Sequence, residues 1–188
     1  AFMAMPLFIL TAEIMSRAGV TRSLIDFAMS IVGRFRGGLG HVNILTSVFF
    51  AGISGSAIAD SAALSRTFVP EMKARGYDPY YAGAITAASS MIGPIIPPSI
   101  IMIIYGGLTG ASVAALFIAG VIPGMILAAS LMALNAIMAN LKGHPGGDSD
   151  DLPRFLPSLL NAAPALCLHI VIPGSIVFGL TTQTEGSA

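Results

Sequence analysis

The residues of this chain most able to do chemistry lie in one short stretch, Gly52-Ile-Ser-Gly-Ser-Ala-Ile-Ala-Asp60, inside a long apolar region. Its hydroxyls and carboxylate offer oxygen ligands and hydrogen-bond partners, and its glycines permit an irregular backbone. In a soluble protein this stretch would be a loop between two core helices. In a bilayer, irregular backbone survives only where protein buries it or where it lines a water-filled cavity. A carboxylate at that depth is costly and indicates function by default.

A second stretch, Gly93-Pro-Ile-Ile-Pro-Pro-Ser99, also interrupts an apolar region. Three prolines and a glycine in seven residues cannot form a continuous helix. The carbonyl groups freed by the break need partners, and a cation is one way to supply them. We therefore expect a discontinuous membrane helix that begins with Asp78 as N-cap and Pro79 in the first turn and resumes at Ser99.

The composition is typical of a membrane protein. The chain is 55% hydrophobic and 10% charged, whereas soluble domains are about 25% charged. Its formal net charge is zero, so nothing in the charge indicates a nucleic-acid partner. The single Cys167 excludes an internal disulfide and is predicted to be an inert buried thiol. The chain starts inside an apolar segment without a charged leader, and we interpret it as a piece of a larger polytopic protein.

The two arms beside the first stretch predict how it is held. Residues 39–51 and 57–69 are each long enough for about 20 Å of helix, short of the ~30 Å hydrocarbon core. Basic residues stand at both outer ends: Arg34 and Arg36 before the first arm, Lys73 and Arg75 around the second arm's end. The positive-inside rule places both ends on the cytoplasmic face. The pattern predicts a re-entrant helical hairpin whose tip is residues 52–56.

The predicted fold class is an all-α polytopic membrane protein with this hairpin and the discontinuous helix. An amphipathic segment over residues 21–36 carries charges along its length and is expected to lie in the interface as an arm helix. His144 is expected to be an exposed histidine in a linker. The predicted segments are 1–38 (the end of a membrane helix plus the arm helix, on the scaffold side), 39–75 (the hairpin), 76–110 (the discontinuous helix of a transport domain), 111–141 (a membrane helix), 142–153 (a cytoplasmic linker) and 154–188 (a membrane helix and the start of the next segment).

Several motifs together resemble the large permease subunit of tripartite ATP-independent periplasmic (TRAP) transporters. They are the Gly52–Asp60 stretch, Val69-Pro-Glu-Met-Lys-Ala-Arg-Gly-Tyr77, and the Gly93–Ser99 stretch followed by Tyr105-Gly, in matching order and spacing. The segment Thr182-Gln-Thr-Glu-Gly186 resembles the family's Thr-Pro-Thr-Glu-Ala, with Gln183 and Gly186 as departures. Arg66 is a further departure, because this position is usually small or apolar. It could pair with Asp60 or Glu71, or snorkel.

The resemblance implies a secondary transporter of the ion-transporter superfamily, built from two inverted repeats of which this chain is mainly the first. It implies an elevator-type mechanism and import of organic anions (C4-dicarboxylates or related carboxylic acids) across the bacterial inner membrane, coupled to Na⁺. The implied partners are a small membrane subunit and a periplasmic substrate-binding protein, within the lipid bilayer. We expect no cofactor besides the coupling ion, no transition metal and no enzymatic activity.

With Na⁺ as the coupling ion that the resemblance implies, we assign roles to residues in and beside the two stretches. Na⁺ ligands are expected from their carbonyl and hydroxyl oxygens: Gly52, Ser54, Ser56, Ser90, Gly93 and Pro97. The substrate anion is expected near the positive end of the second arm and at the second break, at Ser54, Gly55, Ser56, Pro98 and Ser99. Asp60 would oppose an anion, so it serves either cation attraction or structural hydrogen bonding. Ser54 and Ser56 could alternatively do no more than cap the second arm.

Two other functions fit parts of the sequence. Gly52-Ile-Ser-Gly55 matches the Gly-x-Ser-Gly form of rhomboid intramembrane proteases, and His169 on a later helix could act as base. A protease does not explain the second break. An ion channel is the other alternative, distinguished by whether flux is coupled to Na⁺ and saturates with a binding protein.

Overall fold

The computed structural model describes residues 10, 14, 19–146 and 152–178. All regular elements in this part of the chain are helices. Two of them, α7 and α8, are long and apolar enough to cross a membrane. The helices are α2 (Val20–Val32), α3 (Gly38–Ser54), α4 (Ala57–Ala74), α5 (Pro79–Ser90), α6 (Ile100–Thr109), α7 (Val113–Lys142) and α8 (Phe155–Val177).

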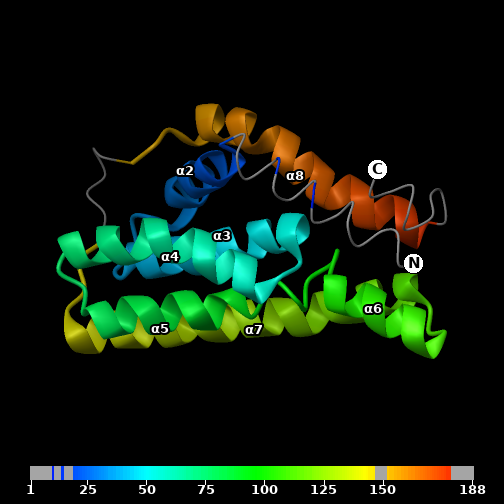
Figure 1. The fold of residues 1–188 in the computed structure, drawn as a ribbon. Coiled ribbons are helices and arrows are strands. Elements are labelled where there is room, and N and C mark those ends of the chain that lie inside the picture. The colour runs from blue at the N-terminus through cyan, green and yellow to red at the C-terminus, as the bar shows by residue number, and fades with distance from the viewer. Residues whose placement is uncertain (1–9, 11–13, 15–18, 147–151, 179–188) are drawn as a thin grey trace.

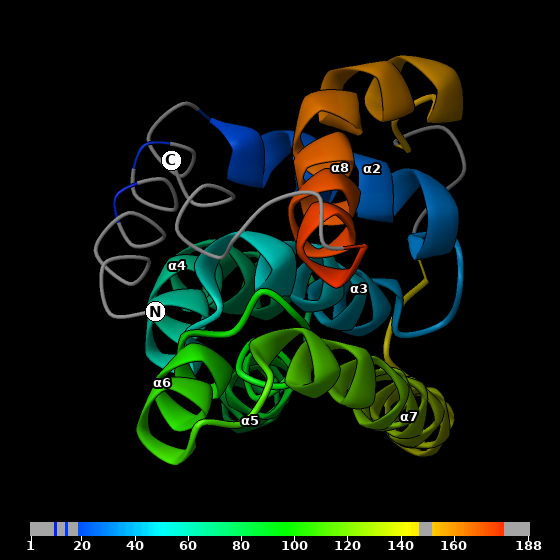
Figure 2. The ribbon, with the colours of Figure 1, turned by 90° about the vertical axis from the view of Figure 1, so that its right-hand side faces the viewer.

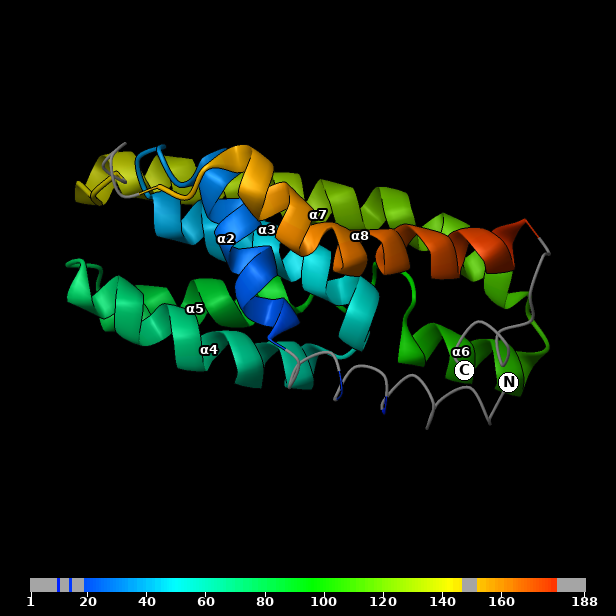
Figure 3. The same cartoon turned by 90° about the horizontal axis from the view of Figure 1, so that it is seen from above.

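The helices form three layers, which are clearest when the molecule is seen from its end (Figure 2). Helices α5, α6 and α7 form one outer layer, α3 and α4 the middle layer, and α2 and α8 the other outer layer. The middle layer and α5 and α7 run along the length of the molecule (Figure 1), whereas α2 crosses α3 obliquely (Figure 3). Apolar side chains of α3, α4, α5 and α7 fill the main core between these layers. The layering buries α3 and exposes one side of α7 and α8.

A helical hairpin, α3 and α4, occupies the middle layer, and its helices are longer than the sequence indicated. They have 17 and 18 residues, or about 26 and 27 Å at the usual rise. Only Gly55 and Ser56 separate them, so the prediction that the break starts at Gly52 is wrong. The helix also continues past Pro70, and the Glu71–Arg75 ion pair, with Nε and Oε1 2.8 Å apart, spans its last turn.

The second interruption, between α5 and α6, lies where the sequence predicted it. Asp78 caps α5 by accepting a hydrogen bond from the Tyr80 amide at 2.9 Å, with Pro79 in the first turn. Ser99 caps α6 and also donates to the Pro94 carbonyl at 2.7 Å, which closes the loop between the helices. Helix α6 continues beyond α5 along the length of the molecule (Figure 1). The chain therefore has a discontinuous helix.

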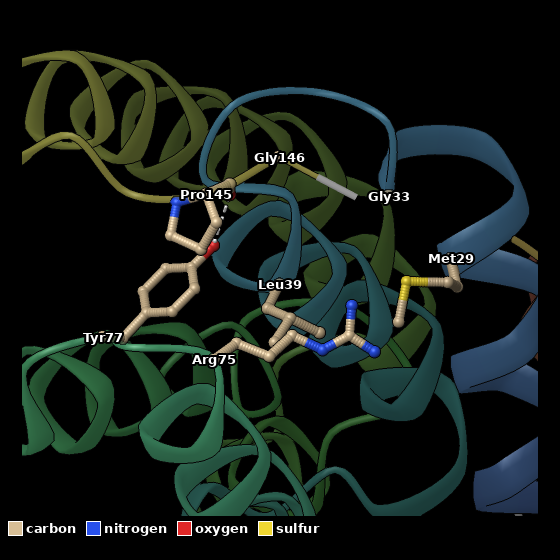
Figure 4. A pocket seen from close by; sticks show the side chains of 7 residues that line it. All are labelled: Met29, Gly33, Leu39, Arg75, Tyr77, Pro145 and Gly146. Atoms are coloured by element: carbon tan, nitrogen blue, oxygen red, sulfur yellow. Dashed lines mark hydrogen bonds between the residues drawn. The ribbon is translucent and has the colours of Figure 1, made fainter. Parts of the chain in front are cut away.

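The ends of α4 and α7 and the start of α3 meet at one end of the molecule, the basic end. There the Pro145 carbonyl accepts hydrogen bonds from the Gly37 amide and the Tyr77 hydroxyl, both at 3.2 Å. Burial raises the pKa of Tyr77 to about 12, so the hydroxyl remains a donor. Figure 4 shows Tyr77, Arg75 and Pro145 around a cavity of about 10 Å³, enough for about one water.

His144 is buried at this end, so the prediction that it is exposed is wrong. Its ring lies 4.5 Å from the Tyr77 ring and 4.8 Å from the Tyr81 ring. Burial lowers the pKa of His144, and the positive charge of Lys142 lowers it further. The aromatic contacts remove the imidazole from water, which the linker sequence alone did not indicate.

Cys167 is exposed on α8, which corrects the prediction of a buried thiol. Helix α8 lies in an outer layer, and several of its apolar side chains are exposed in the same way. The motif at residues 182–186 and the acidic part of the linker at residues 147–151 lie outside the described residues.

Candidate functional site

The hairpin tip meets the break between α5 and α6, and Gly55 makes the contact possible. Gly55 ends α3 in the left-handed conformation, with φ +56°, which only glycine adopts at little cost. A Cβ on Gly55 would lie 2.5 Å from the Pro98 carbonyl oxygen and 3.1 Å from Ser99 Cα. The backbones of the two predicted stretches are therefore in close contact.

Among the described residues, Asp60 is the charged group at this junction. It lies one turn into α4 and is fully buried, with 0% of its surface exposed. Its Oδ1 accepts a hydrogen bond from the Ser54 hydroxyl across the tip. Its Oδ2 is buried and has no hydrogen-bond partner. A buried carboxylate oxygen without a partner is costly.

Gly93 provides the space that this orphan oxygen occupies. A Cβ on Gly93 would collide with Asp60 Oδ2 and would lie 3.3 Å from the Ser90 carbonyl oxygen. Two oxygens thus lie next to Gly93: Asp60 Oδ2 from α4, and the Ser90 carbonyl oxygen at the end of α5, which also accepts a hydrogen bond from the Gly93 amide at 3.2 Å. Such convergence of a carboxylate and a carbonyl is the donor chemistry that binds hard cations.

The other residues predicted for the site make different contacts around the junction. Ser56 caps α4 by accepting from the Ala59 amide at 3.4 Å. The Ser90 hydroxyl donates to the Thr86 carbonyl at 2.7 Å within α5. Gly52 lies in the last turn of α3, where carbonyls lack partners within the helix. Pro97 and Pro98 are buried in the break.

Helix ends of both polarities converge here. Helices α3 and α5 end at the junction, and the carbonyls at their C-termini favour a cation. Helices α4 and α6 begin there, and the amides at their N-termini favour an anion. Asp60 lies in the first turn of α4, so its negative charge stands at one of the anion-favouring helix ends and opposes an anion there.

Arg66 does not neutralise Asp60. The Arg66 side chain is exposed on α4, and Glu71, its other predicted partner, pairs with Arg75 instead. Among the described residues no ion pair involves Asp60. The carboxylate therefore keeps one hydrogen bond from Ser54 and no compensating positive charge from the described protein.

A buried polar network beside the site was not predicted. Asn43 Nδ2 donates to Thr86 Oγ1 at 2.6 Å, and Ser47 Oγ donates to Ser89 Oγ at 3.0 Å. Ser89 Oγ also donates to Asn43 Oδ1 at 3.3 Å. Asn43 and Ser47 are four residues apart, so they share one face of α3. That spacing inside an apolar arm is the signal that could have identified the network.

The protease alternative gains no support from Ser54, whose hydroxyl donates to a carboxylate rather than to an imidazole. The described residues contain no group of three or more His, Cys, Asp and Glu side chains able to hold a metal ion. The donors at the junction are instead one carboxylate, hydroxyls and carbonyls.

Comparison with known proteins identifies the relatives of this chain. The family model described as "Tripartite ATP-independent periplasmic transporter, DctM component" matches residues 1–188. The chain is 42% identical to the sialic acid TRAP transporter permease protein SiaT of Haemophilus influenzae, over 98% of the chain and 30% of that protein. It is 39% identical to the C4-dicarboxylate TRAP transporter large permease protein DctM of Pseudomonas aeruginosa, over 99% of the chain and 44% of that protein. It is 37% identical to the 2,3-diketo-L-gulonate TRAP transporter large permease protein YiaN of Escherichia coli, over 100% of the chain and 44% of that protein. The chain thus spans less than half the length of these relatives.

Proposed function

The chain belongs to the family of DctM components of tripartite ATP-independent periplasmic transporters, and on this basis we propose that it forms part of a Na⁺-coupled importer of organic anions. The observation that supports this most directly is the buried Asp60 with its unpartnered Oδ2 beside Gly93. A Na⁺ ion would balance that charge. The Ser90 carbonyl and the last-turn carbonyls of α3 would supply further oxygens.

In this proposal α3 and α4 form a re-entrant hairpin within the inner membrane. Basic residues flank the hairpin at its base, with Arg34 and Arg36 before α3 and Lys73 near the end of α4, and Lys142 ends α7 at the same end of the molecule. By the positive-inside rule this end faces the cytoplasm. The tip and the break then lie partway along α7, at membrane depth, where irregular backbone must be buried by protein or line a cavity. The inverted-repeat architecture and multi-pass topology are parts of the same proposal.

The substrate is proposed to be a carboxylic acid. The named relatives carry sialic acid, C4-dicarboxylates and 2,3-diketo-L-gulonate, which share an ionised carboxyl group at neutral pH. The N-termini of α4 and α6, around Ser56 and Ser99, would attract it. A small membrane subunit and a periplasmic binding protein would complete the transporter. The hairpin and the discontinuous helix would move together as an elevator.

Uptake into proteoliposomes tests the proposal. The full-length permease with its small subunit and loaded binding protein should accumulate the organic anion only under an inward Na⁺ gradient. Asp60→Asn keeps the size of the side chain and removes its charge, so we expect Na⁺-driven uptake to fall about tenfold or more, the loss from one charge-assisted contact. Asp26→Asn, at an exposed carboxylate of α2, is the matched control. Equal uptake with and without Na⁺, or flux without the binding protein, would refute coupled import.

A further inference from the structure

A groove of about 400 Å³ lies at the basic end, between α2 and α7 over the start of α3. This volume is in the range of ligand sites. Its floor is apolar, formed by Val32, Met132 and Ala136, and its polar lining comes from Arg36, His41 and Asn140. The groove is separate from the hairpin tip, because it lies at the opposite end of α3.

The polar side of the groove carries positive charge that pairs with no carboxylate in the described part of the chain. Arg36 is exposed, and no described carboxylate forms an ion pair with it. The Arg34 guanidinium lies 5.8 Å from the centre of the Phe35 ring, whose edge in turn meets the His41 ring. These contacts hold the Arg34 guanidinium, a second positive charge, near the groove. Among the lining residues there is no acidic side chain.

The apolar side of the groove continues along α7, away from the basic end. Met132, Ala129 and Met125 are three and four residues apart, so they share one face of the helix. Ala129 and Met125 are exposed. An elongated apolar group that starts in the groove could therefore run along this face toward the middle of the molecule.

We infer that the groove binds an anionic phospholipid, with its phosphate at Arg36 and one acyl chain on the apolar face of α7. Basic pockets between membrane helices on the cytoplasmic side bind anionic headgroups. The guanidinium of Arg36 matches a phosphate in two parallel hydrogen bonds. The buried imidazole of His41, 9% exposed, and the amide of Asn140 form the adjacent wall. The inference uses the membrane placement proposed above but not the Na⁺ site, so the two can fail separately.

Native mass spectrometry of the full-length permease complex, stripped of lipid and then titrated, tests this site. Phosphatidylglycerol should form a saturable adduct at concentrations where phosphatidylethanolamine and free glycerol phosphate do not. Arg36→Ala should weaken that adduct about tenfold or more, and Arg36→Lys should weaken it less. Arg22→Ala, at an exposed arginine of α2 that does not line the groove, should leave it unchanged.

A second variant, Ala136→Phe, keeps every charge and fills the floor of the groove. It should also weaken the phosphatidylglycerol adduct, which separates acyl-chain binding from charge attraction. Free glycerol phosphate binding as tightly as the lipid would overturn the inference in favour of a simple anion site. Unchanged lipid binding in both Arg36→Ala and Ala136→Phe would overturn it in favour of a groove covered by another part of the protein.

Discussion

At the residue scale, the site depends on how closely Asp60 approaches Gly93. The approach exists because Gly93 has no side chain, and the Ser54 hydroxyl turns the carboxylate toward that space. The sequence identified each of these residues as unusual for an apolar region. It did not show that Ser54 and Asp60, six residues apart across a turn, hydrogen bond to each other, because that contact depends on the left-handed backbone of Gly55.

Gly93→Ala should impair Na⁺ coupling. The added methyl group would collide with Asp60 Oδ2, so the carboxylate must shift from its present position beside Gly93. We expect the Na⁺ concentration for half-maximal uptake to rise about tenfold, equivalent to ~1.4 kcal/mol. Gly83→Ala, on the preceding helix α5, is the control, because a Cβ there meets nothing within 4 Å. Identical Na⁺ dependence in the two variants would show that the contact at Gly93 is not part of the cation site.

At the element scale, the polar network between α3 and α5 fixes one arm of the hairpin to the first half of the discontinuous helix. Asn43 is completely buried and bridges Thr86 and Ser89. Since this network joins the two elements that carry the site, it keeps the tip and the break in register. The two elements should then move as one unit.

Asn43→Leu should lower the thermal stability of the purified permease. It leaves the Thr86 and Ser89 hydroxyls with fewer partners in a buried place, at a cost of about 1–3 kcal/mol. Asn161→Leu, at an exposed position of α8, is the matched control in a thermal unfolding experiment. Melting temperatures that agree between the two variants would mean that the network adds nothing to the stability of the contact between α3 and α5.

The order of the helices and the places of both interruptions could be predicted from the sequence, because glycine and proline act locally. The helix ends could not. Helix α3 extends through Ser54, whose hydroxyl bonds to Asp60 across the turn, and α4 continues past Pro70 to Ala74. Of the residues predicted for the site, the structure brings Gly55 against Pro98 and Asp60 against Gly93. Their ligand roles stay predictions.

At the scale of the whole molecule, the basic ends of α4 and α7 and the basic loop before α3 gather at one end, while α6 extends to the other (Figure 1). The Pro145 carbonyl connects these segments, because it accepts hydrogen bonds from the Gly37 amide before α3 and from the Tyr77 hydroxyl after α4. Because both ends of the hairpin lie there, the proposed topology has α3 and α4 enter and leave the membrane on the cytoplasmic side.

Cysteine labelling in a Cys167→Ser background should report this topology. Cysteines placed at Arg34 and at Lys73 should react with an impermeant maleimide only from the cytoplasm, and one at Thr109 only from the periplasm. All three positions are exposed in the structure. Labelling of Arg34→Cys and Lys73→Cys from opposite faces would mean that α3 and α4 together cross the membrane rather than re-enter it.

Direct measurement of Na⁺ binding to the purified full-length permease, without substrate, tests the central proposal most directly. We expect saturable binding to the unmodified protein and an affinity about tenfold or more lower in Asp60→Asn, because among the described residues the carboxylate supplies the charge at the junction. Ser54→Ala should weaken binding less, since it removes the hydrogen bond that orients the carboxylate and leaves the charge in place. Asp26→Asn should bind as the unmodified protein does. Equal Na⁺ affinity in the unmodified protein and in Asp60→Asn would contradict the assignment of Asp60 and Gly93 to the cation site.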